Sequence, residues 1–291
     1  MRKLLEFAAI TALIAGLSST GIHAASAQDA CSSNAVVIVA HPDDALVFMH
    51  DNVRYQRAIG NCVHLVSMTS YYDDVTSVRE EAARAAYQKI LDANAPDDTV
   101  QHFDTTIRQQ YGNYVYHTYR IHNSTDLTLS FLRLPASTYP GFTEGSVYSR
   151  KDDQTIVSSL KSFLEAKMPD RVYTLNTQGL LYGINECVVQ QNGFLSANEC
   201  DHYDHVGTAL LAKAAFSASA IRATLYEFHA YDMARGMSVN ANISVPACQL
   251  FCAVRDAYNS IDTAAAATPW GALLSSNDMY SATATVSSAS G

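Results

Sequence analysis

Apolar and polar positions follow one another along the chain in a pattern that predicts strands and helices in turn. Strand-like apolar runs occupy residues 36–40, 63–69, 127–134, 171–176 and 223–231. Helical patterns lie between them, one ending near residue 59 and others covering 77–93, 152–167 and 205–218. This succession implies parallel strands joined by right-handed crossovers. We expect a Rossmann-like, doubly wound α/β fold, with a mostly parallel sheet and helices on both faces.

The two ends of the chain depart from this pattern. Arg2 and Lys3 precede an apolar stretch over residues 4–17, and small residues follow up to Ala27. This pattern predicts a signal peptide over residues 1–27 and a secreted protein, extracellular or periplasmic. No later segment approaches the length of a membrane span. Beyond residue 233 the pattern predicts one helix, at about 247–262. We expect a single domain over 28–282 and a disordered tail over 283–291.

Composition and charge limit the classes of partner that the protein can bind. Apolar residues make up 48% of the chain, enough for a sizeable core. The formal charge is −9, and removal of a leader with net charge +1 brings it to −10. Such a charge disfavours nucleic acid and anionic membranes as partners. Sequons at Asn123 and Asn242 matter only in a host that glycosylates.

Six cysteines in an exported chain predict disulfide bonds. Cys31 and Cys62 each precede a predicted strand, so in neighbouring parallel strands they lie at one sheet edge and can bridge. The further expected pairs are Cys187 with Cys200 and Cys248 with Cys252. The sequence contains no C-x-x-C pair, so we do not expect a metal site made of thiolates.

Two polar clusters are candidates for chemistry. His41, Asp43 and Asp44 follow the first strand, at the edge where open α/β sheets bind ligands. Their structural alternative is a helix N-cap, for which one aspartate would suffice. His202 and His205, three apart at a helix start, share one face, and their alternative is a pair of surface histidines.

Together the clusters fit a metal site. A catalytic zinc takes about three nitrogen or oxygen ligands and leaves a position for water. His41, Asp44 and His205 provide that set. Adjacent residues point in different directions, so Asp43 is free to act as a general base. Zn²⁺ is the expected cofactor, and another divalent transition metal is the alternative.

At these residues the sequence resembles the LmbE-like, or PIG-L, zinc-dependent deacetylases. The A-H-P-D-D signature of that family appears at residues 40–44, and its H-x-D-H signature appears at 202–205. The resemblance implies the same three zinc ligands and Asp43 as the base. It makes His202 the residue that stabilises the oxyanion or protonates the leaving amine. The implied substrate is an N-acetylglucosamine-type amino sugar or glycoconjugate.

Residues 79–87 and 127–135 resemble the secreted branch of this family. The resemblance places Arg79 at the substrate, and the alternative is an arginine paired with nearby acids. Two positions differ from the family. Ala45 stands where many members have a carboxylate, and Cys200 stands where some have a tyrosine.

We therefore expect a secreted zinc-dependent N-deacetylase, a hydrolase of a non-peptide carbon–nitrogen bond, with Asp204 orienting one of the histidines. Tyr71, Tyr182 and Tyr203 are candidates for the missing hydroxyl. Tyrosines at 111, 114, 116 and 119 are expected in a loop or core rather than a glycan groove. The alternatives are a metal-binding, non-catalytic secreted carbohydrate-binding protein and a metallohydrolase for another acyl amide or ester.

Overall fold

The computed structural model describes ten ranges of the chain: 31–69, 73–92, 102–104, 106–122, 124–137, 144–177, 202–228, 230, 245–263 and 285–288. The chain divides after Ala30, and residues 31–291 form one compact unit that contains every described residue. Both predicted sequons and the predicted Cys187–Cys200 pair lie outside the described ranges.

An eight-stranded sheet crosses this unit in the order β3-β4-β5-β2-β1-β6-β7-β8. The strands are β1 (Asn34–Val39), β2 (Cys62–Thr69), β3 (Ile107–Tyr111), β4 (Tyr114–Arg120), β5 (Leu127–Leu134), β6 (Arg171–Leu175), β7 (Thr224–Phe228) and β8 (Thr285–Ser288). The five central strands, from β5 to β7, are parallel to one another. The strands β3, β4 and β8 pair antiparallel at the two edges.

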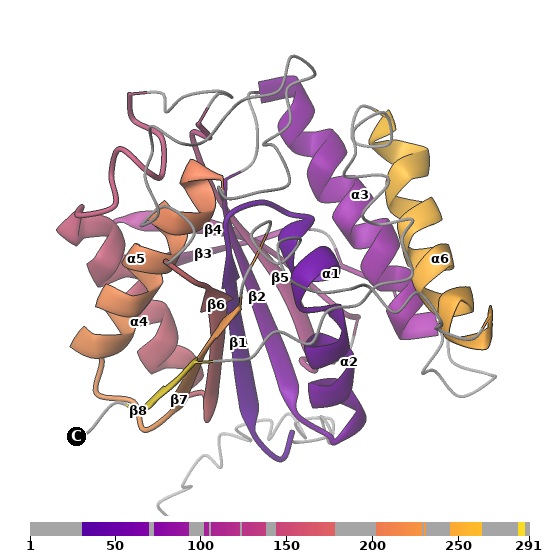
Figure 1. Cartoon of the computed structure of the whole chain (residues 1–291), viewed down its shortest axis with the longest axis horizontal. Helices are drawn as coiled ribbons and strands as arrows, with labels where there is room; N and C mark the ends of the chain where they lie inside the picture. The colour runs from indigo at the N-terminus through magenta and orange to yellow at the C-terminus, as the bar shows by residue number, and fades with distance from the viewer. Residues whose placement is uncertain are drawn as a thin grey trace, which may run out of the picture. The chain divides into compact units, whose positions relative to one another are not determined.

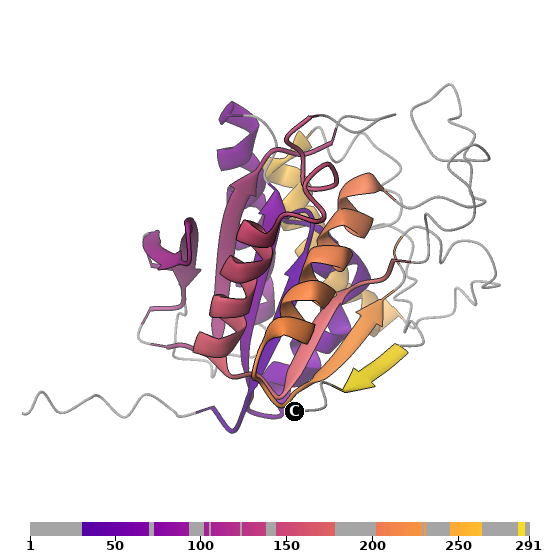
Figure 2. The same cartoon turned by 90° about the vertical axis from the view of Figure 1, so that its left-hand side faces the viewer.

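Helices cover both faces of the sheet (Figures 1 and 2). They are α1 (Asp44–Phe48), α2 (His50–Ala58), α3 (Asp73–Asp92), α4 (Gln154–Lys167), α5 (Tyr203–Ala218) and α6 (Val245–Ile261). Residues of α1, α2, α3 and α6 contribute to one apolar cluster, and residues of α4 and α5 to the other. The expected doubly wound, mostly parallel fold is confirmed.

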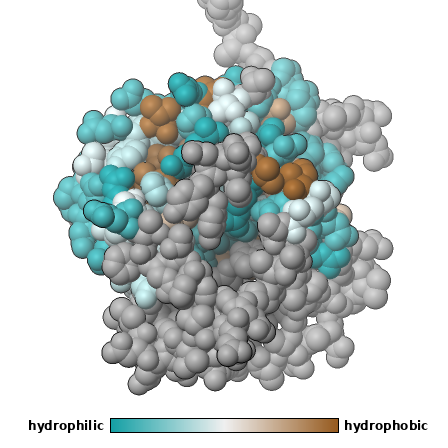
Figure 3. All heavy atoms as spheres, turned by 90° about the horizontal axis from the view of Figure 1, so that it is seen from above, coloured by the Kyte–Doolittle hydropathy of each residue, from teal (hydrophilic) through white to brown (hydrophobic). Residues whose placement is uncertain are grey.

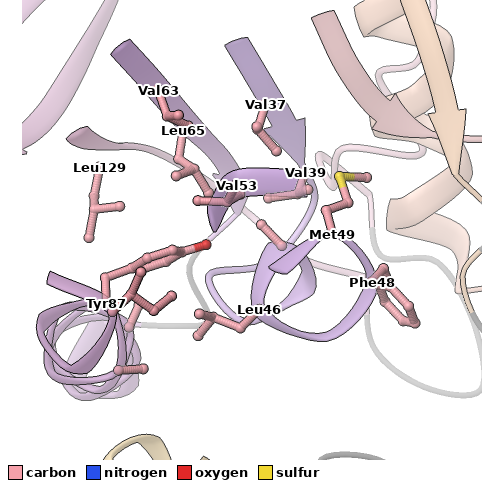
Figure 4. Packing of buried hydrophobic residues seen from close by; sticks show 14 of the residues in the cluster. Val37, Val39, Leu46, Phe48, Met49, Val53, Val63, Leu65, Tyr87 and Leu129 are labelled. Atoms are coloured by element: carbon pink, nitrogen blue, oxygen red, sulfur yellow. The ribbon is translucent and has the colours of Figure 1, made fainter. Parts of the chain in front are cut away.

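The strand β1 shows why the fold is doubly wound. Val37 and Val39 face the first cluster, whereas Val36 and Ile38 face the second, because successive side chains of a strand point to opposite faces. All four are at most 1% exposed. The strand β1 carries only apolar residues after Asn34, so the polar residues that follow it stand out. Figure 4 shows the first cluster, where side chains of β1, β2, α1 and α3 face one another.

Two regions differ from the predictions. Residues 107–120 form a β-hairpin around Gly112, whose φ of 56° is the left-handed conformation that a tight turn needs. The loop alternative for its tyrosines is therefore wrong, and the core alternative holds for Tyr116, which is fully buried. The expected disorder of 283–291 is also wrong for residues 285–288, because β8 pairs with β7.

The Cys31–Cys62 disulfide is confirmed. The strands β1 and β2 are parallel neighbours with Asn34 opposite Cys62, and the two cysteines are bonded with their Cα atoms 5.4 Å apart. Cys248 and Cys252 are both on α6, and their side chains lie outside the described part.

Within the described ranges, no helix combines the length and apolar character of a membrane span. Viewed from above, the coloured residues are mostly hydrophilic, with small and separate hydrophobic patches (Figure 3).

Candidate metal centre

The first polar cluster lies where the connections of the sheet reverse direction. The strand β1 has β2 on one side and β6 on the other, so the crossovers leave it to opposite sides. Such a switch point opens a crevice beyond the carboxyl ends of the strands. His41, Asp43 and Asp44 follow β1 at this point and are buried, with exposed fractions of 5%, 1% and 0%.

The helix-cap alternative fails for Asp43. It occupies the N-cap position of α1, yet its side chain makes no capping hydrogen bond. Asp44 holds the turn instead, because its Oδ2 accepts a hydrogen bond of 2.8 Å from the backbone amide of His41. The two adjacent aspartates thus have different structural tasks.

The helix α5 brings the second cluster to the same place. His202 is its N-cap residue, and His205 lies in its first turn. The ring centroid of His41 is 4.9 Å from that of His202 and 5.2 Å from that of His205. The surface alternative is therefore wrong for His205, which is fully buried.

His41, Asp44 and His205 each offer a ligand atom, and the three atoms lie within 4.8 Å of one another. Oδ1 of Asp44 is 3.4 Å from Nδ1 of His41 and 3.2 Å from Nε2 of His205. Two imidazoles and one carboxylate are a donor set that zinc accepts, so the residues present fit the expected ion. These are the three ligands expected from the sequence, and their binding of a metal stays a prediction.

Asp204 lies against His41 rather than His202. Its Oδ2 is 3.4 Å from Nε2 of His41 and 3.8 Å from Nδ1 of His202. Its carboxylate also accepts two hydrogen bonds of 2.7 Å from the amide and hydroxyl of Ser137. A carboxylate behind a ligating histidine fixes the orientation of the ring. No motif in the sequence marks Ser137 as part of the site.

The charges of the site move several pKa values. Burial opposes ionisation of Asp44, but His205 and His41 outweigh it and hold the pKa of Asp44 well below its usual value. Burial likewise opposes ionisation of Asp204, and His41 prevails, which lowers its pKa to about 2. Burial would lower the pKa of His41, but the carboxylates of Asp44 and Asp204 raise it.

The neutral form of His202 is favoured in this setting. Burial first, and then the charges of His41 and His205, lower the pKa of His202 to about 3. Its Nδ1 accepts a hydrogen bond of 3.2 Å from the backbone amide of Asp204. An accepting Nδ1 carries no proton, so Nε2 carries the single proton of the neutral ring.

Arg79 of α3 contacts the carboxylate of Asp43. Its Nε also lies 3.4 Å from the hydroxyl of Tyr258 on α6 and 3.5 Å from the carboxylate of Asp262. These contacts match the alternative in which Arg79 pairs with nearby acids. No motif marks Tyr258 or Asp262 as part of the site, because both lie far along the chain from His41 and His202.

Asp43 keeps one oxygen available beside this ion pair. Its Oδ1 has no hydrogen-bond partner among the described residues. Burial raises the pKa of Asp43, the charge of Arg79 opposes that rise, and the charge of Asp44 adds to it.

The remaining candidates pack elsewhere or lie outside the described ranges. Ala45 is fully buried in the first apolar cluster, so a carboxylate at that position would meet the core. The ring of Tyr203 packs against Tyr148, with centroids 4.9 Å apart. Tyr71 and Tyr182 lie outside the described ranges.

No protein-family model matches the sequence, and no curated protein matches it. Solved structures that resemble the chain include a zinc-inhibited form of the teicoplanin deacetylase Orf2, at 13% identity and a TM-score of 0.49, covering 82% of this chain and 88% of that chain. Another is the N,N'-diacetylchitobiose deacetylase from Pyrococcus horikoshii, at 14% identity and a TM-score of 0.43, covering 83% and 75%. A third is GalB, the 4-carboxy-2-hydroxymuconate hydratase from Pseudomonas putida KT2440, at 13% identity and a TM-score of 0.42, covering 88% and 95%.

Proposed function

We propose that this protein is a zinc-dependent hydrolase of the LmbE-like type, which removes the acetyl group from an N-acetylglucosamine-type amino sugar or glycoconjugate. One observation carries the proposal: a buried set of two imidazoles and a carboxylate lies next to a second carboxylate that is outside this set. A site that only held a metal would need neither Asp43 nor His202. This supports an enzyme over a metal-binding carbohydrate-binding protein.

His41, Asp44 and His205 would hold the metal, and Asp204 would keep the ring of His41 in its orientation. A bound divalent cation would lower the pKa of a water molecule and polarise the acetyl carbonyl. Asp43 would accept the proton of the attacking water through Oδ1, the oxygen without a described partner. The same proton would then pass to the departing amine, and acetate and a free amine would be released.

His202 acts in this proposal as a neutral hydrogen-bond donor. The backbone amide of Asp204 occupies its Nδ1, so the proton on Nε2 is the one that can reach the oxyanion. General acid catalysis by His202 would instead require a protonated imidazolium. Arg79 would position Asp43 through their ion pair rather than bind the sugar.

The proposal includes export. The leader pattern over residues 1–27 and the Cys31–Cys62 disulfide both suit an oxidising compartment. The exported chain should begin at Gln28, which N-terminal sequencing of the secreted protein checks. An exported chain that still began at Met1 would contradict the cleavage.

The activity is tested by acetate release. The zinc-loaded protein is incubated with N-acetylglucosamine, its oligomers and its glycolipids, and zinc content is measured on the same sample. Acetate from one of these substrates supports the proposal. A zinc-loaded protein that releases no acetate from any of them contradicts it, and turnover of other acyl amides or esters would then identify a different metallohydrolase.

Asp43→Asn separates proton transfer from metal binding, because the amide keeps the shape of the side chain and cannot accept the proton. We expect kcat to fall by about a hundredfold or more while the zinc content stays near that of the wild type. The matched control is Asp44→Asn, which should lose both zinc and activity. An Asp43→Asn variant of full activity would show that Asp43 is not the base.

A further inference from the structure

Three further residues with metal-ligand atoms meet at the far end of the sheet from His41. Within the described ranges, His102, Asp104 and His122 each offer an atom, and these atoms lie within 4.8 Å of one another. His122 follows β4, which runs antiparallel to β5. The strand β4 therefore ends near the N-terminal ends of the parallel strands. His41 lies at the opposite edge, after the end of β1, so the two groups are separate.

The backbone fixes the direction of these side chains. Phe103 and Ile121 form an antiparallel bridge, and both pack against the first apolar cluster. The amide of Asp104 donates to the carbonyl of Arg120, and that of His122 donates to the carbonyl of His102, each at 2.8 Å. Side chains alternate along paired strands, so the residues on either side of the bridge point outward together.

The outward side chains are arranged like ligands. The rings of His102 and His122 lie directly across from each other, with centroids 4.9 Å apart and planes inclined by 12°. Oδ1 of Asp104 is 2.7 Å from Nδ1 of His122. One ring nitrogen of each histidine and one carboxylate oxygen of Asp104 lie within 4.8 Å of one another. His122 and Asp104 remain open to solvent, with side-chain exposures of 49% and 25%.

We propose that His102, Asp104 and His122 form a second binding site for a divalent transition metal such as Zn²⁺, apart from the catalytic centre. Two imidazole nitrogens and one carboxylate oxygen are a common set for such ions, and water would complete the coordination. The ion would replace the direct contact between His122 and Asp104. It would also tie residues 102–104 to the end of β4, and binding to the folded state alone stabilises that state.

Arg120 would compete with the ion for the carboxylate of Asp104. Its Nε is 3.5 Å from Oδ2 of Asp104, whereas His122 contacts Oδ1. The two oxygens thus have different partners, and Oδ1 is the one that contacts His122. Removal of the guanidinium would leave more negative charge for an ion, so the site should bind Zn²⁺ more tightly in Arg120→Gln.

The test counts zinc ions on the whole chain. Protein stripped with a chelator is dialysed to equilibrium against Zn²⁺, and bound zinc is measured for four proteins. We expect two ions per chain in the wild type, one in the double variant His102→Asn and His122→Asn, and one in Asp44→Asn. Arg120→Gln should keep both ions, with the second bound more tightly.

Thermal unfolding gives a second measurement, on Asp44→Asn and on a triple variant that also carries His102→Asn and His122→Asn. In the Asp44→Asn background, Zn²⁺ should raise Tm, and it should fail to do so when His102 and His122 are also replaced by Asn. The proposal is overturned if the double variant binds as much zinc as the wild type. It is also overturned if Zn²⁺ shifts the Tm of Asp44→Asn and the Tm of the triple variant equally. Asp44→Asn removes only the ion of the metal centre. The two sites are therefore tested separately, and the failure of one does not imply the failure of the other.

Discussion

Asp43 and Asp44 are adjacent and equally buried, yet they have opposite electrostatic surroundings. Asp44 lies between His41 and His205, and its pKa falls; Asp43 is held by a single arginine, and burial raises its pKa. The backbone turn after β1 causes the difference, because consecutive side chains leave it in different directions. A pair of aspartates can therefore supply a metal ligand and a base from one short motif.

His64 gives a residue-scale prediction outside the metal centre. Burial, and then the charge of Lys167, lower its pKa from 6.5 to about 3, while its Nδ1 lies 2.8 Å from the hydroxyl of Thr128. Between these pH values the unfolded chain binds a proton that the folded chain does not. The contribution of His64 to stability is thus present above pH 6.5 and is lost as the pH falls, by about 1.4 kcal/mol per unit.

Chemical unfolding at pH 7.0 and pH 5.5 checks this for the wild type and His64→Gln. The wild type should lose more unfolding free energy than the variant over that interval, because glutamine does not titrate. Equal losses in the two proteins would show that His64 takes up its proton in the folded state as readily as in the unfolded one.

At the scale of elements, α5 depends on close contact with the segment before α4. A Cβ atom on Gly207 would lie 2.7 Å from Cα and 2.9 Å from the backbone nitrogen of Tyr148. The helix begins with His202 and His205, so any shift of α5 also moves a predicted metal ligand.

Gly207→Ala has two opposing effects on stability, one from helix propensity and one from packing. Propensity alone favours alanine by about 1 kcal/mol, whereas overpacking against a backbone costs about 1–3 kcal/mol. We expect a net loss of unfolding free energy in urea, together with weaker zinc binding. A stabilised variant would show that the two segments separate easily, which would contradict the tight contact.

Elements also show where sequence patterns were insufficient. The central strands and α3, α4 and α5 were predictable because their apolar runs are long and regular. The hairpin of β3 and β4 was missed, although Gly112 and Asn113 between alternating tyrosines are a hairpin signal. The strand β8 was missed because its short, polar sequence is typical of a tail, and its structure comes from pairing with β7.

For the whole molecule, the Cys31–Cys62 disulfide joins the beginnings of two central strands. It closes a loop with a sequence separation of 31 residues that includes His41, Asp43 and Asp44. A loop of that length restricts the unfolded chain by about 3–4 kcal/mol.

Replacing both cysteines by alanine should lower the unfolding free energy by about that amount. Urea unfolding of the double variant and of the oxidised wild type measures the difference. The zinc content of the folded variant should stay unchanged, since the bond lies at the opposite end of the strands from the metal centre. Equal unfolding free energies would mean that the bond does not constrain the unfolded state.

The sequence by itself determined the fold class, the order of the main elements and the six candidate site residues within the two motifs. These features are local: hydrophobic periodicity reports which face of an element is buried, and the residues after a strand are placed by that strand. Only the tertiary structure decided that Asp204 supports His41, that Ser137 holds Asp204, and that Arg79 pairs with Asp43. It also brought His102 across from His122. Contacts of this kind join side chains that are distant along the chain, and they depend on how the elements pack, which no single stretch of sequence specifies.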